Sequence, residues 1–367
     1  MMLLLKNADI YTPKHFGKGD ILIKNDKIEK IAQNITVKCE ILDCKNKIIS
    51  PMFVDGHEHL LGNYWDENGI INSGVGTIVA CLANESNPKC VEKLIEITNR
   101  LRKENEIVCY TLAGSKNYTE KIDNFILNYK NVVGIKTALF QRQRPKPNLS
   151  YEKLKQDAVE TFKAGLKTGK SVQVHIHLDH PFAKVDKVSI DDINSGNLDN
   201  LNWIDKIVEE TGVPYSLFKL THAQKYYNRI LEYANKGCYI DYTAFESEYD
   251  NRFDCLVEAI KNKSVDTSRI SISSDLGIMA MERGGSYETP ITLMNTIQKL
   301  VLEKGLKLEY VLPFITTNAL APIKNVENFI NENMQAKLLI FNKDLEIESI
   351  ILNEKVLKNI VENRVQK

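Results

Sequence analysis

Residues 151–178 read YEKLKQDAVETFKAGLKTGKSVQVHIHL and contain the unit from which the fold of this chain is inferred. The first part places apolar residues at three- and four-residue spacing, as in an amphipathic helix, and ends in glycine and lysine. The run that follows is rich in β-branched residues and predicts a strand. Helix and strand therefore succeed each other within one short segment.

Strand-like runs recur eight times after residue 52, with amphipathic stretches between several of them. The runs are FVDGHEH (53–59), TIVACLA (77–83), IVCYTLAG (107–114), VVGIKTAL (132–139), SVQVHIHL (171–178), YSLFKLTH (215–222), CYIDYTA (238–244) and ISISSD (270–275). Other helical stretches cover 88–105, 201–212 and 227–237. This alternation is typical of an α/β protein with a (β/α)8 TIM-like barrel.

The two ends of the chain follow a different pattern. Residues 19–35 and 39–51 alternate apolar and polar residues around Asn-Asp and Gly, as hairpins with one wet face do, and residues 336–359 repeat the style. We expect both ends to combine into a small β-sandwich domain, because the termini of a domain often lie close together. The predicted domains are the small β domain at 1–50 with 335–367 and the barrel at 51–334.

Composition excludes several classes of protein. The 367 residues contain 48 basic and 48 acidic residues, so no global charge gathers nucleic acid or anionic lipid. The five-residue apolar start is shorter than the apolar part of a signal peptide, and no run is long enough to span a membrane. Seven scattered cysteines without CxxC spacing fit free thiols in a reducing compartment. We expect a cytoplasmic protein.

The ends of the predicted strands carry metal-ligand side chains. His57 and His59 are two residues apart in an extended run, so their imidazoles point to the same face. His177 ends the fifth run, His222 the sixth and Asp275 the eighth. Strand ends converge at one face of a closed barrel, and imidazole and carboxylate are ligands that zinc prefers. These five residues account for one metal ion or most of two.

Other residues near the strand ends leave alternatives open. From the residues alone, Lys136 in the fourth run is interpreted as a lysine that extends from the barrel rim into solvent. His175 fits a second layer of the site or the core. His180 in a loop and His15 outside the barrel are not expected to be ligands.

Taken together, six motifs resemble the amidohydrolase superfamily, and most closely the metallo-type isoaspartyl (β-aspartyl) dipeptidases. The motifs are PMFVDGHEHLLG, GTIVACLA, VVGIKTAL, VHIHLD, LTHAQK and ISISSD. The resemblance runs along nearly the whole chain, including the final KLLIFNKDLEIESIILNEKVL, which looks like the strand-rich tail of that family.

The resemblance implies a binuclear zinc site and a hydrolytic reaction. It implies that His57, His59 and Asp275 hold the more buried ion and that His177 and His222 hold the more exposed one. Lys136, carboxylated on its side-chain nitrogen, would bridge the two ions. A hydroxide between the ions would attack an amide carbonyl, and Asp275 would act as the general base and then the general acid.

The resemblance also implies substrate contacts, and here the chain departs from the family. The carboxylate that binds the free α-amino group corresponds to Asp66, which is shorter than the family's glutamate and has Glu67 beside it. The tyrosine that polarises the scissile carbonyl corresponds to Lys116, with Tyr118 two residues later. These changes leave the substrate open.

Two arginines that bind substrate in the family are altered as well. Where one arginine is expected, the chain has Gln143 between Arg142 and Arg144, and Lys225 replaces the other. Lysine keeps the charge but loses the bidentate geometry of a guanidinium. The metal-binding pattern is therefore kept, while each position that contacts substrate in the family differs.

Three functions are consistent with this pattern. The first is a β-aspartyl dipeptidase-like amidohydrolase that cleaves an amide or isopeptide bond in a small substrate. The second keeps the metal chemistry but acts on N-acyl amino acids or cyclic amides. The third is a non-catalytic assembly protein with the same barrel, which the complete set of ligand positions disfavours. The resemblance further implies a homo-oligomer.

Overall fold

The structure is a computed structural model, and it describes most of the chain. The described residues are 2–61, 67–82, 88–105, 107–114, 123–140, 149–178, 201–223, 227–244, 252–277, 291–323, 329–353 and 355–358. Among the helices of these segments, none is long and apolar enough to cross a membrane.

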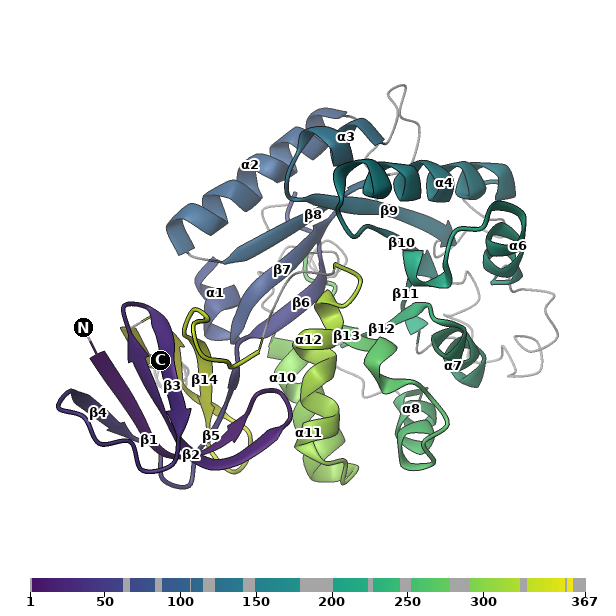
Figure 1. The fold of residues 1–367 in the computed structure, drawn as a ribbon. Coiled ribbons are helices and arrows are strands. Elements are labelled where there is room, and N and C mark those ends of the chain that lie inside the picture. Colours follow the sequence, from purple (N-terminus) through teal and green to yellow (C-terminus); the bar gives the residue numbers. More distant parts are fainter. Residues whose placement is uncertain are drawn as a thin grey trace, which may run out of the picture.

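An eight-stranded parallel barrel forms the larger part of the molecule (Figure 1). Its strands pair in sequence order and are β6 (Phe53–Glu58), β7 (Val75–Cys81), β8 (Val108–Gly114), β9 (Val132–Phe140), β10 (Gln173–Leu178), β11 (Phe218–Thr221), β12 (Tyr239–Thr243) and β13 (Ile270–Ser273). Each of the eight predicted runs overlaps one strand. The barrel is nearly closed by a parallel bridge between Glu58 and Leu276, where the His59 amide donates to the Leu276 carbonyl at 2.8 Å.

Helices surround this barrel (Figure 1). They are α1 (Glu67–Asn72), α2 (Pro88–Asn105), α3 (Asp123–Asn128), α4 (Tyr151–Thr168), α6 (Asn202–Thr211), α7 (Tyr227–Lys236), α8 (Arg252–Lys261), α10 (Ile291–Gln298), α11 (Leu308–Val311) and α12 (Thr317–Leu320). Short η segments are η2 (Tyr215–Leu217), η4 (Thr267–Arg269), η5 (Lys299–Glu303) and η6 (Leu312–Ile315). The four predicted helical stretches are confirmed as α2, α4, α6 and α7.

Helix α4 shows why the local sequence sets these boundaries. The Ser150 hydroxyl accepts a hydrogen bond from the Lys153 amide at 3.2 Å and so satisfies one of the free donors of the first turn. Leu154, Ala158 and Gly165 face the barrel along one stripe. The helix ends at Gly169, which adopts the left-handed conformation that favours glycine.

A separate mixed sheet joins the two ends of the chain. It contains β1 (Met2–Tyr11), β2 (His15–Lys24), β3 (Lys27–Ala32), β4 (Glu40–Asp43), β5 (Ile48–Pro51), β14 (Lys337–Phe341), β15 (Ile347–Leu352) and β16 (Lys355–Lys358). The N-terminal part of β1 pairs with β4 and its later part with β5, which in turn pairs antiparallel with β14. The predicted barrel with a small β domain from both termini is confirmed, and the domain boundaries given above stay a prediction.

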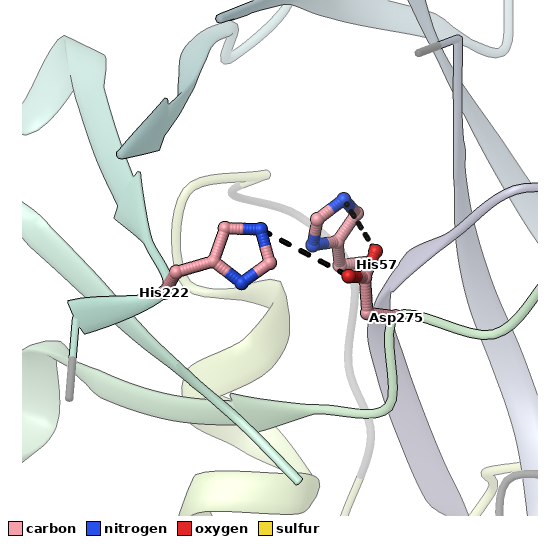
Figure 2. Close-up of side chains that lie close together, drawn as sticks. All are labelled: His57, His222 and Asp275. Carbon is pink, nitrogen blue, oxygen red and sulfur yellow. Dashed lines mark ion pairs between the residues drawn. The ribbon is translucent and has the colours of Figure 1, made fainter. Parts of the chain in front are cut away.

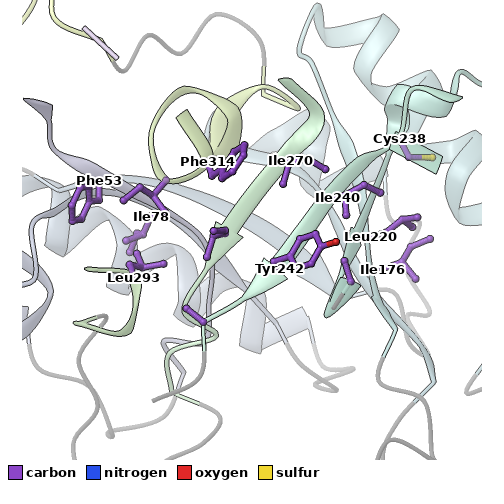
Figure 3. Close-up of a cluster of buried hydrophobic side chains, with 14 of the residues drawn as sticks. Phe53, Ile78, Ile176, Leu220, Cys238, Ile240, Tyr242, Ile270, Leu293 and Phe314 are labelled. Carbon is purple, nitrogen blue, oxygen red and sulfur yellow. The ribbon is translucent and has the colours of Figure 1, made fainter. Parts of the chain in front are cut away.

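Apolar side chains of the barrel strands belong to two buried clusters. Figure 3 shows the outer layer, where Ile78, Ile176 and Ile240 belong to the large core beneath the helices. A smaller apolar cluster is formed by residues of β6, β7, β8 and β9 together with residues in and after α12. Its buried members are Val54, Val79, Cys81, Leu112, Val133, Ala319, Leu320 and Ile323.

Candidate metal centre

Five of the six predicted metal ligands lie at or just beyond the carboxyl ends of barrel strands, as active-site residues of such barrels do, and Lys136 lies in the middle of its strand. His57 belongs to β6, Lys136 to β9 and His177 to β10. His59, His222 and Asp275 follow β6, β11 and β13 within two residues and are buried, which sets them apart from charged loop residues. Figure 2 shows His57, His222 and Asp275 converging from their separate strands.

The two histidines of the HxH pair face the same carboxylate. The Nε2 atoms of His57 and His59 lie 3.0 Å apart, and Asp275 Oδ1 lies 3.4 Å from the first and 3.3 Å from the second. Among the described residues, no group donates a hydrogen bond to this buried oxygen. An unsatisfied buried carboxylate oxygen is costly. Together with two imidazole nitrogens it forms a donor set that fits a divalent cation.

Lys136 enters the same cluster. Its Nζ lies 2.6 Å from His57 Nε2, and the side chain is only 2% exposed, so the interpretation of a lysine extending from the rim into solvent is wrong. Burial lowers the pKa of Lys136 to about 8, so a fraction of this side chain is an uncharged amine near neutral pH. An uncharged amine beside the predicted metal-ligand histidines is chemically suited to modification, whereas an ammonium there would repel a cation.

His177 and His222 form a second pair adjoining the first. His222 Nε2 lies 2.8 Å from His177 Nδ1 and 3.9 Å from the other oxygen of Asp275, Oδ2. His57, His222 and Asp275 together present three ligand atoms within 4.8 Å of one another. The structure thus brings all six predicted ligands into one connected cluster around Asp275.

Two of these residues have an unusual backbone. His222 and Asp275 have φ angles of 64° and 58°, in the left-handed region, which costs of order 1–2 kcal/mol per residue outside glycine. Gly277 follows with φ 89°, and a Cβ there would lie 2.1 Å from the His59 carbonyl oxygen. The turn after β13 is therefore pressed against the HxH segment, which explains how Asp275 reaches both histidines.

A second layer lies beneath the cluster and was not found by reading the sequence. The Thr221 hydroxyl lies 3.2 Å from His57 Nδ1 and 2.8 Å from Asp241 Oδ2, and the Thr243 hydroxyl lies 2.9 Å from His222 Nδ1. Asp241 is fully buried. In the sequence, the only sign of this layer was the carboxylate of Asp241 within the apolar seventh run. Its contact with Thr221 becomes evident only when β12 is paired with β11.

His175 belongs to this layer too. It is fully buried, its ring lies 4.7 Å from that of His57, and neither ring nitrogen has a hydrogen-bond partner in the described part of the chain. Burial, reinforced by the charge of Lys136, lowers the pKa of both His57 and His175 well below the usual value. Both rings are therefore neutral at neutral pH, the form in which imidazole binds metal.

Two buried acidic residues, Asp55 before the HxH pair and Glu58 between its two histidines, belong to the same segment. Asp55 accepts hydrogen bonds from the backbone amides of His57 at 3.2 Å and Ser274 at 3.1 Å, which ties β6 to the end of β13. Burial raises the pKa of Asp55 to about 7. Burial and the neighbouring Asp55 raise the pKa of Glu58 well above its usual range. Asp55 thus supports the backbone that presents the two histidines.

The remaining predicted positions lie elsewhere. His15 Nε2 contacts Asp9 at 2.8 Å in the terminal sheet, away from the barrel as expected. His180 lies outside the described residues. So do the five predicted substrate contacts, which are Asp66, Lys116, Arg142, Arg144 and Lys225.

Comparisons with solved structures agree with this architecture. A β-aspartyl dipeptidase from Fervidobacterium islandicum AW-1, solved with a β-Asp-Leu dipeptide, is similar with a TM-score of 0.79 and 22% identity. The match covers 98% of this chain and 96% of that one. A D-hydantoinase structure has a TM-score of 0.70 and 17% identity, with 98% and 95% of the two chains covered.

Curated proteins match over shorter segments. A dihydroorotase from Clostridium botulinum is 32% identical over 139 residues, 36% of this chain and 34% of that protein. A dihydroorotase from Fusobacterium nucleatum is 44% identical over 68 residues, 18% and 15% of the two chains. The chain thus spans about a third or less of the length of these relatives. No protein-family model matches.

The fold of this chain is shared with proteins of one superfamily. The chain has the barrel and small β domain of the solved β-aspartyl dipeptidase and D-hydantoinase, and these proteins and the dihydroorotases belong to the amidohydrolase superfamily. The resemblance inferred from the sequence motifs is confirmed. The TM-score is higher for the β-aspartyl dipeptidase than for the D-hydantoinase.

Proposed function

We propose that this protein is a metal-dependent amidohydrolase that hydrolyses an amide or isopeptide bond in a small substrate. One observation carries the proposal. Asp275 Oδ1 is buried, accepts no hydrogen bond from the described residues, and faces the Nε2 atoms of His57 and His59 within 3.4 Å. A bound cation would be the missing partner of this buried carboxylate oxygen.

The residues would hold two divalent ions, Zn²⁺ by preference. His57, His59 and Asp275 are the proposed ligands of one ion, and His177 and His222 those of the other. Lys136 is the proposed bridge after its neutral amine adds to carbon dioxide, forms an N–C bond and releases one proton. When bound, such ions acidify a water molecule toward neutral pH and polarise a carbonyl.

Asp275 has the chemistry of a proton shuttle in this proposal. With Oδ1 directed at the proposed ion beside His57 and His59, the other oxygen of the carboxylate, Oδ2, would accept a proton from the attacking water. The same carboxyl group would then deliver that proton to the departing amine, which is a poor leaving group until it is protonated. The fixed backbone around Asp275 would keep the carboxylate directed at the reacting bond.

The first substrates to test are β-aspartyl dipeptides, supported by the similarity to the β-aspartyl dipeptidase over nearly the whole chain. Purified protein should contain about two metal ions per chain by elemental analysis and should release free amino acids from a dipeptide panel. The Asp275→Asn variant should keep the fold and lose most turnover. A loaded protein that leaves the whole panel intact would refute the dipeptidase assignment.

A second substrate class is favoured by a different observation. The matches to dihydroorotases and to a D-hydantoinase point to cyclic amides. Ring opening of dihydroorotate or hydantoins, or cleavage of N-acyl amino acids, in preference to dipeptides would establish this alternative.

All seven cysteines are free, which supports the proposed cytoplasmic location, and we retain a homo-oligomer as the proposed assembly.

A further inference from the structure

The polar layer beneath the metal centre is organised around one carboxylate. Asp241 Oδ1 accepts from the Ser271 hydroxyl at 2.6 Å and pairs with the Lys219 ammonium at 3.3 Å. Its Oδ2 accepts from Ser273 at 2.5 Å and Thr221 at 2.8 Å. All five side chains are at most 2% exposed, so water does not compete for these contacts. The carboxylate is the acceptor for every one of these groups.

This arrangement decides the direction of the next hydrogen bond. A threonine hydroxyl has one proton to donate. Because Thr221 donates that proton to Asp241, its oxygen can only accept from His57 Nδ1, which lies 3.2 Å away. In a neutral imidazole, a proton on Nδ1 leaves the lone pair on Nε2. Nε2 is the nitrogen that faces Lys136, His59 and Asp275.

We propose that Asp241, acting through Thr221, fixes the proton of His57 on Nδ1 and so presents Nε2 as a ready metal ligand. Asp241 and Thr221 are thus positioning residues, and neither reaches the reacting atoms. The consequence of this fixed ring proton for metal binding rests on the proposed function. The position of the ring proton is a property of the metal-free protein and is tested without any metal.

The layer makes a specific prediction for Asp241→Asn. An ammonium can only donate, so the amide oxygen takes the place of Oδ1 beside Lys219 and Ser271. The amide NH2 group then occupies the place of Oδ2 and donates to Thr221. The Thr221 hydroxyl is released to donate to His57 Nδ1, and the ring proton moves to Nε2. A substitution that never touches His57 would thereby reverse its tautomer.

The experiment is nitrogen NMR of metal-free protein labelled at its seven histidines, with the His57 signals assigned by their loss in His57→Gln. Wild-type protein should carry the His57 proton on Nδ1. Asp241→Asn should carry it on Nε2, and Thr221→Val, which removes the acceptor, should also move it there. Thr221→Ser should restore the wild-type signal. Ser271→Ala is the matched control, since it removes an equally buried donor to Asp241 without involving Thr221.

Metal affinity, measured by competition with a chelator, provides a second readout. Loss of an outer-layer partner of a ligating histidine costs about 10–100-fold in affinity, so Asp241→Asn and Thr221→Val should weaken zinc binding by that factor. Ser271→Ala and Thr221→Ser should stay within about threefold of wild type. A wild-type proton on Nε2, or an unchanged tautomer in Asp241→Asn, overturns the inference. Failure of the wild-type protein to bind metal would refute the proposed function and leave the tautomer result decisive on its own.

Discussion

Replacing Gly277 with alanine tests whether the turn after β13 shapes the metal centre. The added Cβ would lie 2.1 Å from the His59 carbonyl oxygen, and this oxygen is backbone rather than a movable side chain. Ordinary contact requires the two atoms to separate by more than about 1 Å further. The His59 segment and the Asp275 turn must therefore move apart, although the amide of His59 and the carbonyl of Leu276 hold them together.

The expected magnitude comes from two contributions. Alanine at φ 89° costs about 1 kcal/mol through the left-handed backbone. Forcing a buried backbone segment aside adds about 1–3 kcal/mol, the range measured for overpacked cores. The free energy of unfolding should therefore fall by about 2–4 kcal/mol in total.

Gly169→Ala is the matched control, because Gly169 has φ 69° but nothing within 4 Å of an added Cβ. It should show only the backbone contribution of about 1 kcal/mol. Urea unfolding of both variants measures the difference, and elemental analysis should show metal lost from Gly277→Ala and retained in Gly169→Ala. Equal unfolding midpoints and equal metal content would refute the reasoning.

Three further outcomes follow from other contacts. Lys219→Met leaves the buried Asp241 carboxylate without its ammonium and should lower the free energy of unfolding by about 3–5 kcal/mol, with partial recovery in the double variant Lys219→Met/Asp241→Asn; equal stability of the single and double variants in urea would contradict this. Lys136→Ala should lower the metal content per chain, and added short carboxylates should restore part of it; unchanged metal content would refute a bridging role. Burial alone would raise the pKa of Asp205, but hydrogen bonds from Lys236, Tyr215 and Tyr233 outweigh it and lower the pKa. A lowered folded-state pKa stabilises the protein above the unfolded pKa of about 4, and this stabilisation is lost as pH falls through the folded value. The stability difference between wild type and Asp205→Asn should therefore be largest near neutral pH and shrink in acid, and a difference that grew on acidification would show the sign to be wrong.

The barrel and its ligand positions were predictable because they depend on local periodicity. Apolar spacing distinguished α4 from β10 within residues 151–178, and repetition of that unit implied the barrel. The carboxyl ends of the parallel strands of a barrel lie at the same face, so the sequence alone predicted that His57, His177 and Asp275 lie close together. The pairing of the two termini followed from their shared alternation.

Other features depend on residues distant in sequence. Residue periodicity alone favoured a solvent-exposed Lys136, whereas the closed barrel buries it against His57. Asp241 and Thr221 belong to different strands, and only their register places a carboxylate under the histidine.

By itself, therefore, the sequence determined the kind of fold and which side chains reach one end of the barrel, because helix and strand periods are local properties. Only the tertiary structure decided how those side chains meet. The left-handed backbone at His222 and Asp275, the orphaned oxygen of Asp275 and the hydrogen-bonded layer around Asp241 all arise from closure of the barrel. Closure brings residues from different strands within bonding distance and excludes water from them, and neither effect is visible in the spacing of residues along one chain.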